Sequence, residues 1–144
     1  MQILCFTTKG KVFWLKVYEI PVASRTSKGR PLVNMLNLDD DERVSDILPV
    51  EEFSEDKFIF MATRKGITKK TNLSLFARKW KSGIKAINLD DDDRLIGTAI
   101  TDGTNEILLA ASSGKLIRFK ESKVRAMGRD ARGVKGMKLK KDQK

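Results

Sequence analysis

The 144-residue chain has 40% apolar residues, a net charge of +10 at pH 7, one cysteine and no histidine. Its length suits one domain with its own core, and no apolar run is long enough to cross a membrane. The composition excludes an internal disulfide, the usual zinc sites that contain histidine, and Ser-His or Cys-His nucleophilic catalysis.

The chain starts without the features of a secretory signal. Residues 1–6 contain no basic segment, no long apolar stretch and no cleavage site. We therefore expect a cytoplasmic protein.

Three segments each predict a β-hairpin, because an apolar run, a glycine-containing turn and a second strand-like run follow in the same order. They are residues 3–17, 58–73 and 106–120, with Gly10, Gly66 and Gly114 in the turns. The glycines lie 56 and 48 residues apart, which leaves room for about four short strands and is typical of propeller blades.

Each hairpin is followed by an irregular basic stretch that contains glycine. These stretches are residues 24–38, 77–89 and 128–139, and we expect each to end in a short strand, at Leu38, Leu89 and Leu139. In the first two copies an acidic turn (residues 39–42 and 90–93) and a closing strand come next.

The predicted fold is all-β, a propeller-like repeat of four-stranded blades that forms a partial disc of about three blades. We expect one domain over residues 1–144, with repeat units of about 3–57, 58–105 and 106–144, the last incomplete. A partial array leaves unpaired strand edges, so self-association through the open blade edges is a partner hypothesis.

The charges are distributed in blocks. Residues 115–144 carry 12 basic and 3 acidic side chains, whereas residues 1–114 carry 17 and 16. Between Lys57 and Asn88 there are nine basic residues and no acidic one, and an aspartate run follows. If like turns lie on like edges, one rim is basic and another face is acidic, so that a polyanion would be attracted to one surface only.

The glycine-rich basic stretch at residues 128–141 does not match a nucleotide-binding loop. Gly128 and Gly133 have P-loop spacing, but Val134 and Lys135 follow where that loop needs Lys and then Ser or Thr. Two interpretations remain for Gly29, Gly83, Gly133 and Gly136. They let phosphate oxygens approach peptide N–H groups, or they only make tight turns between strands.

No metal site is predicted, because the acidic runs lack the Gly and Glu spacing of an EF-hand, and a solvated turn is the favoured interpretation. Trp14, within an apolar run, is expected in the core. Trp80, between two lysines, is expected to pack against sugar or a neighbouring blade. The basic end, residues 138–144, is expected to be frayed and solvated.

The sequence resembles the C-terminal DNA-wrapping domain of the bacterial DNA gyrase A subunit. The motifs "ILCFTTKGKVFWLKVYEIP", "KGRPLVNMLNLDDDERV", "ILPVEEF", "FMATRKGITKKT", "DRLIG" and "GKLIRFKESKVRAMGRDARGVKGMKL" carry the likeness and cover nearly the whole chain. The resemblance implies a β-pinwheel, a propeller-like disc whose blades share strands with their neighbours. The family's Gln-Arg-Arg-Gly-Gly-Lys-Gly box is absent here, which fits either a truncated gyrase domain or the related domain of topoisomerase IV.

The resemblance implies a non-catalytic module of an ATP-dependent type IIA topoisomerase that binds and wraps duplex DNA without base readout and supports negative supercoiling. Its implied partners are double-stranded DNA, the remainder of the gyrase A subunit, and the gyrase B subunit within an A2B2 holoenzyme, with no cofactor in this chain. The implied location is the bacterial cytoplasm, at the nucleoid.

Residue by residue, the DNA-binding prediction covers basic side chains on the hairpins and on the glycine-containing stretches. They are Lys9, Lys11, Arg25, Lys28, Arg30, Arg64, Lys65, Lys69, Lys70, Arg78, Lys79, Lys81, Lys85, Lys115, Arg118, Arg125, Arg129, Arg132 and Lys135.

A different class of function stays open beside DNA wrapping. Many propellers are scaffolds, and a charged edge of this kind also suits an acidic protein partner. A scaffold would bind DNA weakly and without dependence on duplex length, whereas a wrapping module would bind with steep salt dependence.

Overall fold

The computed structural model describes residues 1–144 and is all-β, as predicted. Four single-turn 3-10 helices accompany the strands, and no helix has the length and apolar character needed to cross a membrane. The strands are β1 (Gln2–Thr7), β2 (Lys11–Lys16), β3 (Val44–Val50), β4 (Phe58–Thr63), β5 (Ile67–Asn72), β6 (Ile84–Lys85), β7 (Leu95–Thr101), β8 (Glu106–Ala110), β9 (Leu116–Lys120) and β10 (Val134–Lys135). The 3-10 helices are η1 (Val17–Glu19), η2 (Leu32–Asn34), η3 (Leu73–Phe76) and η4 (Glu121–Lys123).

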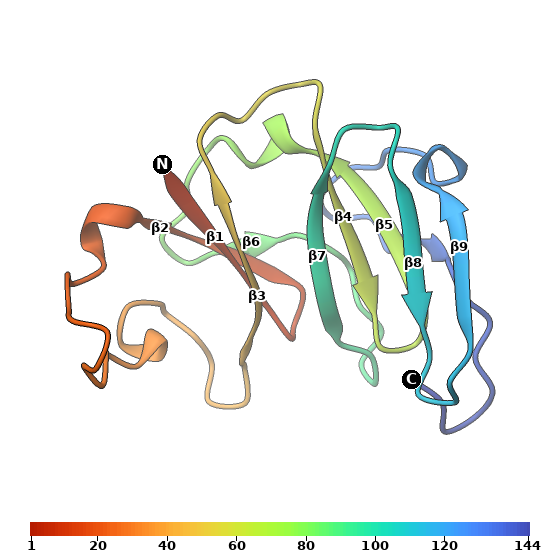
Figure 1. The fold of residues 1–144 in the computed structure, drawn as a ribbon, viewed down its shortest axis with the longest axis horizontal. Coiled ribbons are helices and arrows are strands. Elements are labelled where there is room, and N and C mark those ends of the chain that lie inside the picture. The colour runs from red at the N-terminus through yellow and green to blue at the C-terminus, as the bar shows by residue number, and fades with distance from the viewer.

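The three predicted hairpins form as β1–β2, β4–β5 and β8–β9, and neighbouring repeats share strands. One four-stranded sheet, which we call the first sheet, has the order β3-β1-β2-β6, and the other, the second sheet, has the order β10-β5-β4-β7. The edge strand β6 of the first sheet thus comes from the second repeat, and the edge strand β10 of the second sheet comes from the third repeat. Figure 1 shows the two sheets and the β8–β9 hairpin following one another along the long axis of the molecule.

Backbone hydrogen bonds at the hairpin turns hold each shared strand against the preceding repeat. The carbonyl of Gly10 accepts hydrogen bonds from the backbone N–H groups of Ala86 (2.7 Å) and Ile87 (3.2 Å). The carbonyl of Gly66 accepts from Gly136 (2.8 Å) and Met137 (3.1 Å) in the same way. The repeated pattern in the sequence therefore corresponds to a repeated contact in space.

The main core lies between the first and second sheets. Phe6 of the first sheet meets Phe76 edge-on, with ring centroids 6.2 Å apart, and Ile59 and Ile87 are fully buried beside them. Polar contacts join the inner edges of the sheets, because the Asp46 carboxylate of β3 accepts from the backbone and hydroxyl of Thr98 in β7. This packing leaves β6 and β10 at the opposite, outer edges.

The expected short strands differ from the observed ones. β6 and β10 lie several residues before Leu89 and Leu139, and residues 24–38 form a turn and η2 instead of a strand. The physical reason is that β6 and β10 each pair with the hairpin of the preceding repeat, and no such hairpin faces residues 24–38.

The basic end of the chain, residues 138–144, forms a turn that the sequence did not predict. The backbone N–H of Gln143 donates to the Lys140 carbonyl, as that of Glu42 donates to Asp39 and that of Asp93 to Asp90. The end of the chain therefore forms the same turn as the other repeats instead of fraying, with Lys140 and Lys141 where the second repeat has Asp90 and Asp91. Its lysines are exposed, as expected.

Candidate nucleic-acid interface

Two basic stretches run along the outer edges of the sheets. Residues 77–85 lead into β6 and residues 128–135 lead into β10, and these two strands are the edge strands of the first and second sheets. We call residues 77–85 and 128–135 together the outer basic edge. The two stretches hold equivalent positions because each leads into the edge strand that its repeat adds to the preceding sheet.

Most cations of the outer basic edge have no carboxylate partner. Arg132 donates to Asp90 at 2.8 Å, whereas no ion pair within 4.0 Å involves the other six basic side chains. These six are Arg78, Lys79, Lys81, Lys85, Arg129 and Lys135, and all but the half-buried Arg129 are exposed. Unpaired and exposed cations are free to neutralise an external polyanion.

Glycines in and next to the outer basic edge bring it close to the adjacent hairpin strand of the same sheet. Gly83 has φ +73°, and a Cβ there would lie 2.8 Å from the ring of Phe13 in β2. Gly133 has φ +98°, and a Cβ would come within 3.0 Å of the Thr68 carbonyl oxygen in β5. Gly136 faces the Thr68 side chain. At these three positions tight packing, rather than phosphate approach, explains the glycine.

The predicted separation of basic and acidic turns is wrong. Lys9, in the first hairpin turn, lies 3.1 Å from Asp39 and 2.7 Å from Asp41, and Lys65 in the second turn forms an ion pair with Asp92. The contact with Lys9 lowers the pKa of Asp41 below its usual value. Hairpin turns and acidic turns thus share one rim.

Backbone hydrogen bonds explain this proximity. The N–H of Thr8 donates to the Arg43 carbonyl at 2.8 Å, and that of Arg64 donates to the Arg94 carbonyl at 2.9 Å. Each closing strand therefore starts beside its own hairpin turn. We call this end of the blades the turn rim, and it forms the lower side of the molecule in Figure 1.

Two predicted DNA-binding residues are inside the protein. Lys69 is 0% exposed, and its ammonium donates to the carbonyls of Ala86 (2.6 Å) and Arg129. Burial lowers the pKa of Lys69 to about 8. Lys70 is 6% exposed and lies 3.9 Å from the buried Glu121 carboxylate. Neither ammonium can reach a phosphate outside, so both residues are removed from the predicted interface.

The remaining predicted residues are at the surface in other places. Lys11 and Arg64 are half-buried next to the hairpin turns, and Lys115 and Arg118 are exposed on the third hairpin. Arg118 lies 3.7 Å from Glu106. Arg125 is exposed after η4.

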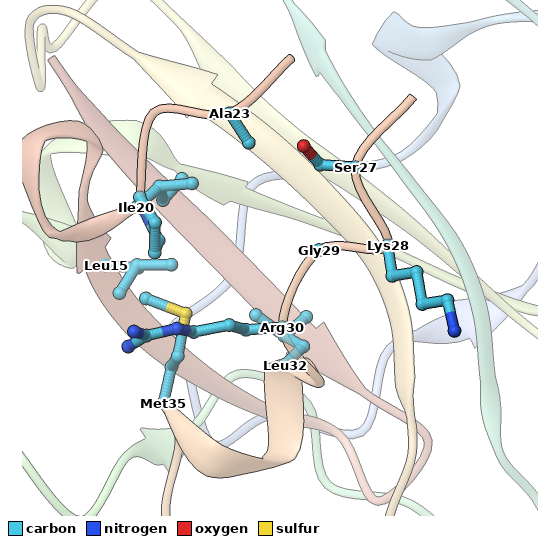
Figure 2. A pocket seen from close by; sticks show the side chains of 10 residues that line it. Leu15, Ile20, Ala23, Ser27, Lys28, Gly29, Arg30, Leu32 and Met35 are labelled. Atoms are coloured by element: carbon cyan, nitrogen blue, oxygen red, sulfur yellow. The ribbon is translucent and has the colours of Figure 1, made fainter. Parts of the chain in front are cut away.

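Arg25, Lys28 and Arg30 lie in the segment before η2, and Lys28 and Arg30 line a cavity there. It has a volume of about 530 Å³, and its apolar wall includes Leu15 and Met35. Figure 2 shows the Arg30 side chain lying alongside Met35, while Lys28 points away from the cavity. Lys28 and Arg30 therefore do not converge on one ligand-sized site.

Sequence reasoning missed two residues near the outer basic edge. Lys16 ends β2 and Tyr18 follows in η1, and the Lys16 ammonium lies 5.2 Å from the centre of the Tyr18 ring. Only the fold brings them next to residues 78–81, so no local pattern in the sequence marks them.

The two tryptophans occupy different environments. Trp14 packs against the main core as predicted, and its indole N–H donates to the Phe76 carbonyl at 2.8 Å. Trp80 is 41% exposed, and the Arg78 guanidinium lies 4.5 Å from its ring centre.

The structure brings together no three His, Cys, Asp or Glu side chains that could hold a metal ion. Cys5 is buried, and burial raises the pKa of its thiol to about 11.

The sequence matches a family described as "DNA gyrase C-terminal domain, beta-propeller" over residues 2–51, 57–102 and 105–144. It is 56% identical over 137 residues to the DNA gyrase A subunit of Haemophilus influenzae, and 50% identical over 138 residues to that of Escherichia coli K12. These matches cover 95% and 96% of the chain but only 16% of each relative.

Solved structures give the same result for the fold. A C-terminal domain of DNA topoisomerase IV matches with a TM-score of 0.89 and 34% identity, covering 99% of this chain and 44% of that one. A DNA gyrase A C-terminal domain matches with a TM-score of 0.80 and 24% identity, covering 99% and 45%. With three shared-strand repeats matched over nearly its whole length, the chain belongs to the DNA gyrase C-terminal domain family.

Proposed function

We propose that this chain binds duplex DNA without sequence preference and bends it along the outer basic edge. The observation that carries the proposal is the set of six basic side chains on this edge that have no carboxylate partner. Phosphate contacts position a protein on DNA but do not read its bases. Sequence-independent binding is therefore the natural result of this arrangement.

The array of blades supplies the geometry that bending requires. Bending 20–30 base pairs by 40–90° costs about 1–6 kcal/mol, which many phosphate contacts along the bend must offset. Successive repeats place equivalent basic stretches on successive blades. A duplex that follows these stretches gains contacts with each blade that it passes.

We further propose that the chain is a non-catalytic module of a gyrase A subunit, where it supports ATP-dependent supercoiling by a holoenzyme that also contains the gyrase B subunit. It spans about 16% of the curated relatives it matches, so the strand-passing chemistry would belong to other regions. The module itself would need no cofactor, and it would act at the bacterial nucleoid in the cytoplasm. The identity of 56% to a gyrase A subunit favours gyrase over topoisomerase IV as the parent.

The test is the affinity for random-sequence duplexes of increasing length, from about one helical turn of 10 base pairs to several turns, across a salt series. If all six unpaired cations contact phosphates, the plot of log K against log salt has a slope of about −5. Affinity should also rise with duplex length. Weak binding that does not change with length would instead favour a protein-interaction scaffold.

A further inference from the structure

The outer basic edge is not uniform, and its strongest concentration of charge lies where the first repeat meets the second. Trp14 of β2 donates to the Phe76 carbonyl at 2.8 Å and Gly83 packs against Phe13, so the segment after Phe76 runs along β2. The end of β2 at Lys16 therefore lies beside residues 78–81, which contain Arg78, Lys79 and Lys81. We call this group, with Tyr18 and Trp80, the first junction. It combines four cations with two exposed aromatic rings.

The Lys16 and Lys79 side chains lie close enough to affect each other's charge, and contact with Tyr18 raises the pKa of Lys16. The pKa of Lys79 is lowered, first by burial and next by the neighbouring Lys16 ammonium. Glu19 is the nearest carboxylate, but its Oε2 already accepts the backbone N–H of Lys16 at 3.0 Å. An anion between the two ammonium groups would remove this repulsion.

The aromatic rings of the first junction extend into solvent beside these cations. Tyr18 is 77% exposed and Trp80 is 41% exposed. A cation already lies over each ring, Lys16 over Tyr18 and Arg78 over Trp80. An exposed aromatic face next to cations suits the sugar and phosphate of a nucleic-acid backbone, because one surface offers an apolar contact and a charge contact.

The equivalent place between the second and third repeats lacks this combination. Counting from the hairpin glycines, Asn72 stands where the first repeat has Lys16. Counting from Gly83 and Gly133, Asp130 stands where the second repeat has Trp80. The first junction is thus a distinct site and not a general property of the repeat.

We propose that Lys16 and Lys79 together hold one phosphate of the DNA backbone, and that Trp80 packs against the adjoining deoxyribose. This site rests on the proposed DNA binding and adds an anchor point to it. The duplex is held most firmly at the first junction and continues from there along residues 128–135.

The first test uses the 144-residue chain and a random-sequence duplex, with the double variant Lys16→Gln/Lys79→Gln. Because the two lysines share one phosphate, the slope of log K against log salt should fall by about 0.9 and the affinity should drop. The control is Lys120→Gln/Lys123→Gln, which removes two charges at the corresponding end of the third hairpin and should leave the slope unchanged. A fall of about 1.8 would contradict the shared phosphate, and no change would contradict the site.

The second test does not depend on how well the lysine variants fold. Duplex binding should change the tryptophan fluorescence of the wild-type chain, and Trp80→Phe should abolish this change. An undiminished change in Trp80→Phe would overturn the role of Trp80. A saturable response to inorganic phosphate, without one to duplex at the same ionic strength, would show a site for free anions and refute the DNA assignment.

These outcomes separate the two proposals. If the wild-type chain binds no duplex, the proposed function fails. If the wild-type chain binds with a steep salt slope while the variants behave like wild type, only the anchor at the first junction fails.

Discussion

The substitution Gly133→Ala tests how the outer basic edge is held on the sheet. Gly133 has φ +98°, and an added Cβ would come within 3.0 Å of the Thr68 carbonyl oxygen and lie 3.1 Å and 3.2 Å from side-chain atoms of Ile67 and Lys69. A left-handed conformation costs a non-glycine residue about 1–2 kcal/mol. Overpacking against backbone that cannot easily move adds about 1–3 kcal/mol. We expect a total loss of about 3 kcal/mol in the free energy of unfolding.

Gly29→Ala is the matched control. Gly29 also has a positive φ, +70°, but an added Cβ would have no neighbour within 4 Å. Only the conformational cost applies, so the loss should be about 1–2 kcal/mol. Urea denaturation of both variants, followed by circular dichroism, measures the difference, with the m-value checked for constancy.

Gly133→Ala and Gly29→Ala should also differ in their affinity for duplex DNA. Displacement of residues 128–135 from β5 moves Arg129 and Lys135 away from their positions, so Gly133→Ala should bind duplex more weakly under conditions in which it is still folded. Equal losses of stability in Gly133→Ala and Gly29→Ala would refute the idea that close packing fixes this part of the edge.

Three further predictions follow from buried and paired charges. Folded Lys69 loses its proton near pH 8 and unfolded lysine near 10.5, so the unfolded state binds more protons between these values. The contribution of Lys69 to stability should therefore rise over this window by up to about 3 kcal/mol, while the Cys5 thiol, with its pKa raised to about 11, opposes the rise above about pH 9. In pH-dependent denaturation the difference in stability between the wild type and Lys69→Met should follow the Lys69 contribution, because Cys5 is common to both. Glu121 is buried and accepts from the Thr101 hydroxyl and from two backbone N–H groups, so Glu121→Gln should lower the free energy of unfolding by about 2–4 kcal/mol in urea titrations. Asp92→Asn frees Lys65 on the turn rim from its ion pair. If DNA follows only the outer basic edge, as proposed, duplex affinity at low salt should stay unchanged; an increase would show that DNA reaches the turn rim.

The hairpins were predictable because their signals are local. An apolar run, a glycine turn and a second run are contiguous in the sequence, and the structure forms strands at each. The pairing of β6 with β2 was not visible in the same way, because it joins Ile84 to Val12 across a whole repeat. Only the resemblance to a family with shared strands supplied it.

The wrong predictions at the interface also arise from contacts between residues that are far apart in the sequence. Lys69 and Lys70 belong to a basic block in the sequence, but residues 128–133 fold over β5 and bury Lys69, whose hydrogen-bond partner Arg129 is 60 residues away. The acidic turns look separate from the hairpin turns because many residues intervene, yet Asp41 lies beside Lys9. Charge blocks in a repeat sequence therefore show which side chains recur, but not which of them become paired or buried.

Site-specific photo-cross-linking to duplex DNA tests the central claim most directly. Cys5 is buried with a raised pKa, so it should remain unlabelled, and a single new cysteine can carry the cross-linker. Ser82→Cys places the probe on the outer basic edge, and Asp40→Cys places it on the turn rim. The proposed path predicts strong cross-links from position 82 and few from position 40. Cross-links mainly from position 40 would contradict it.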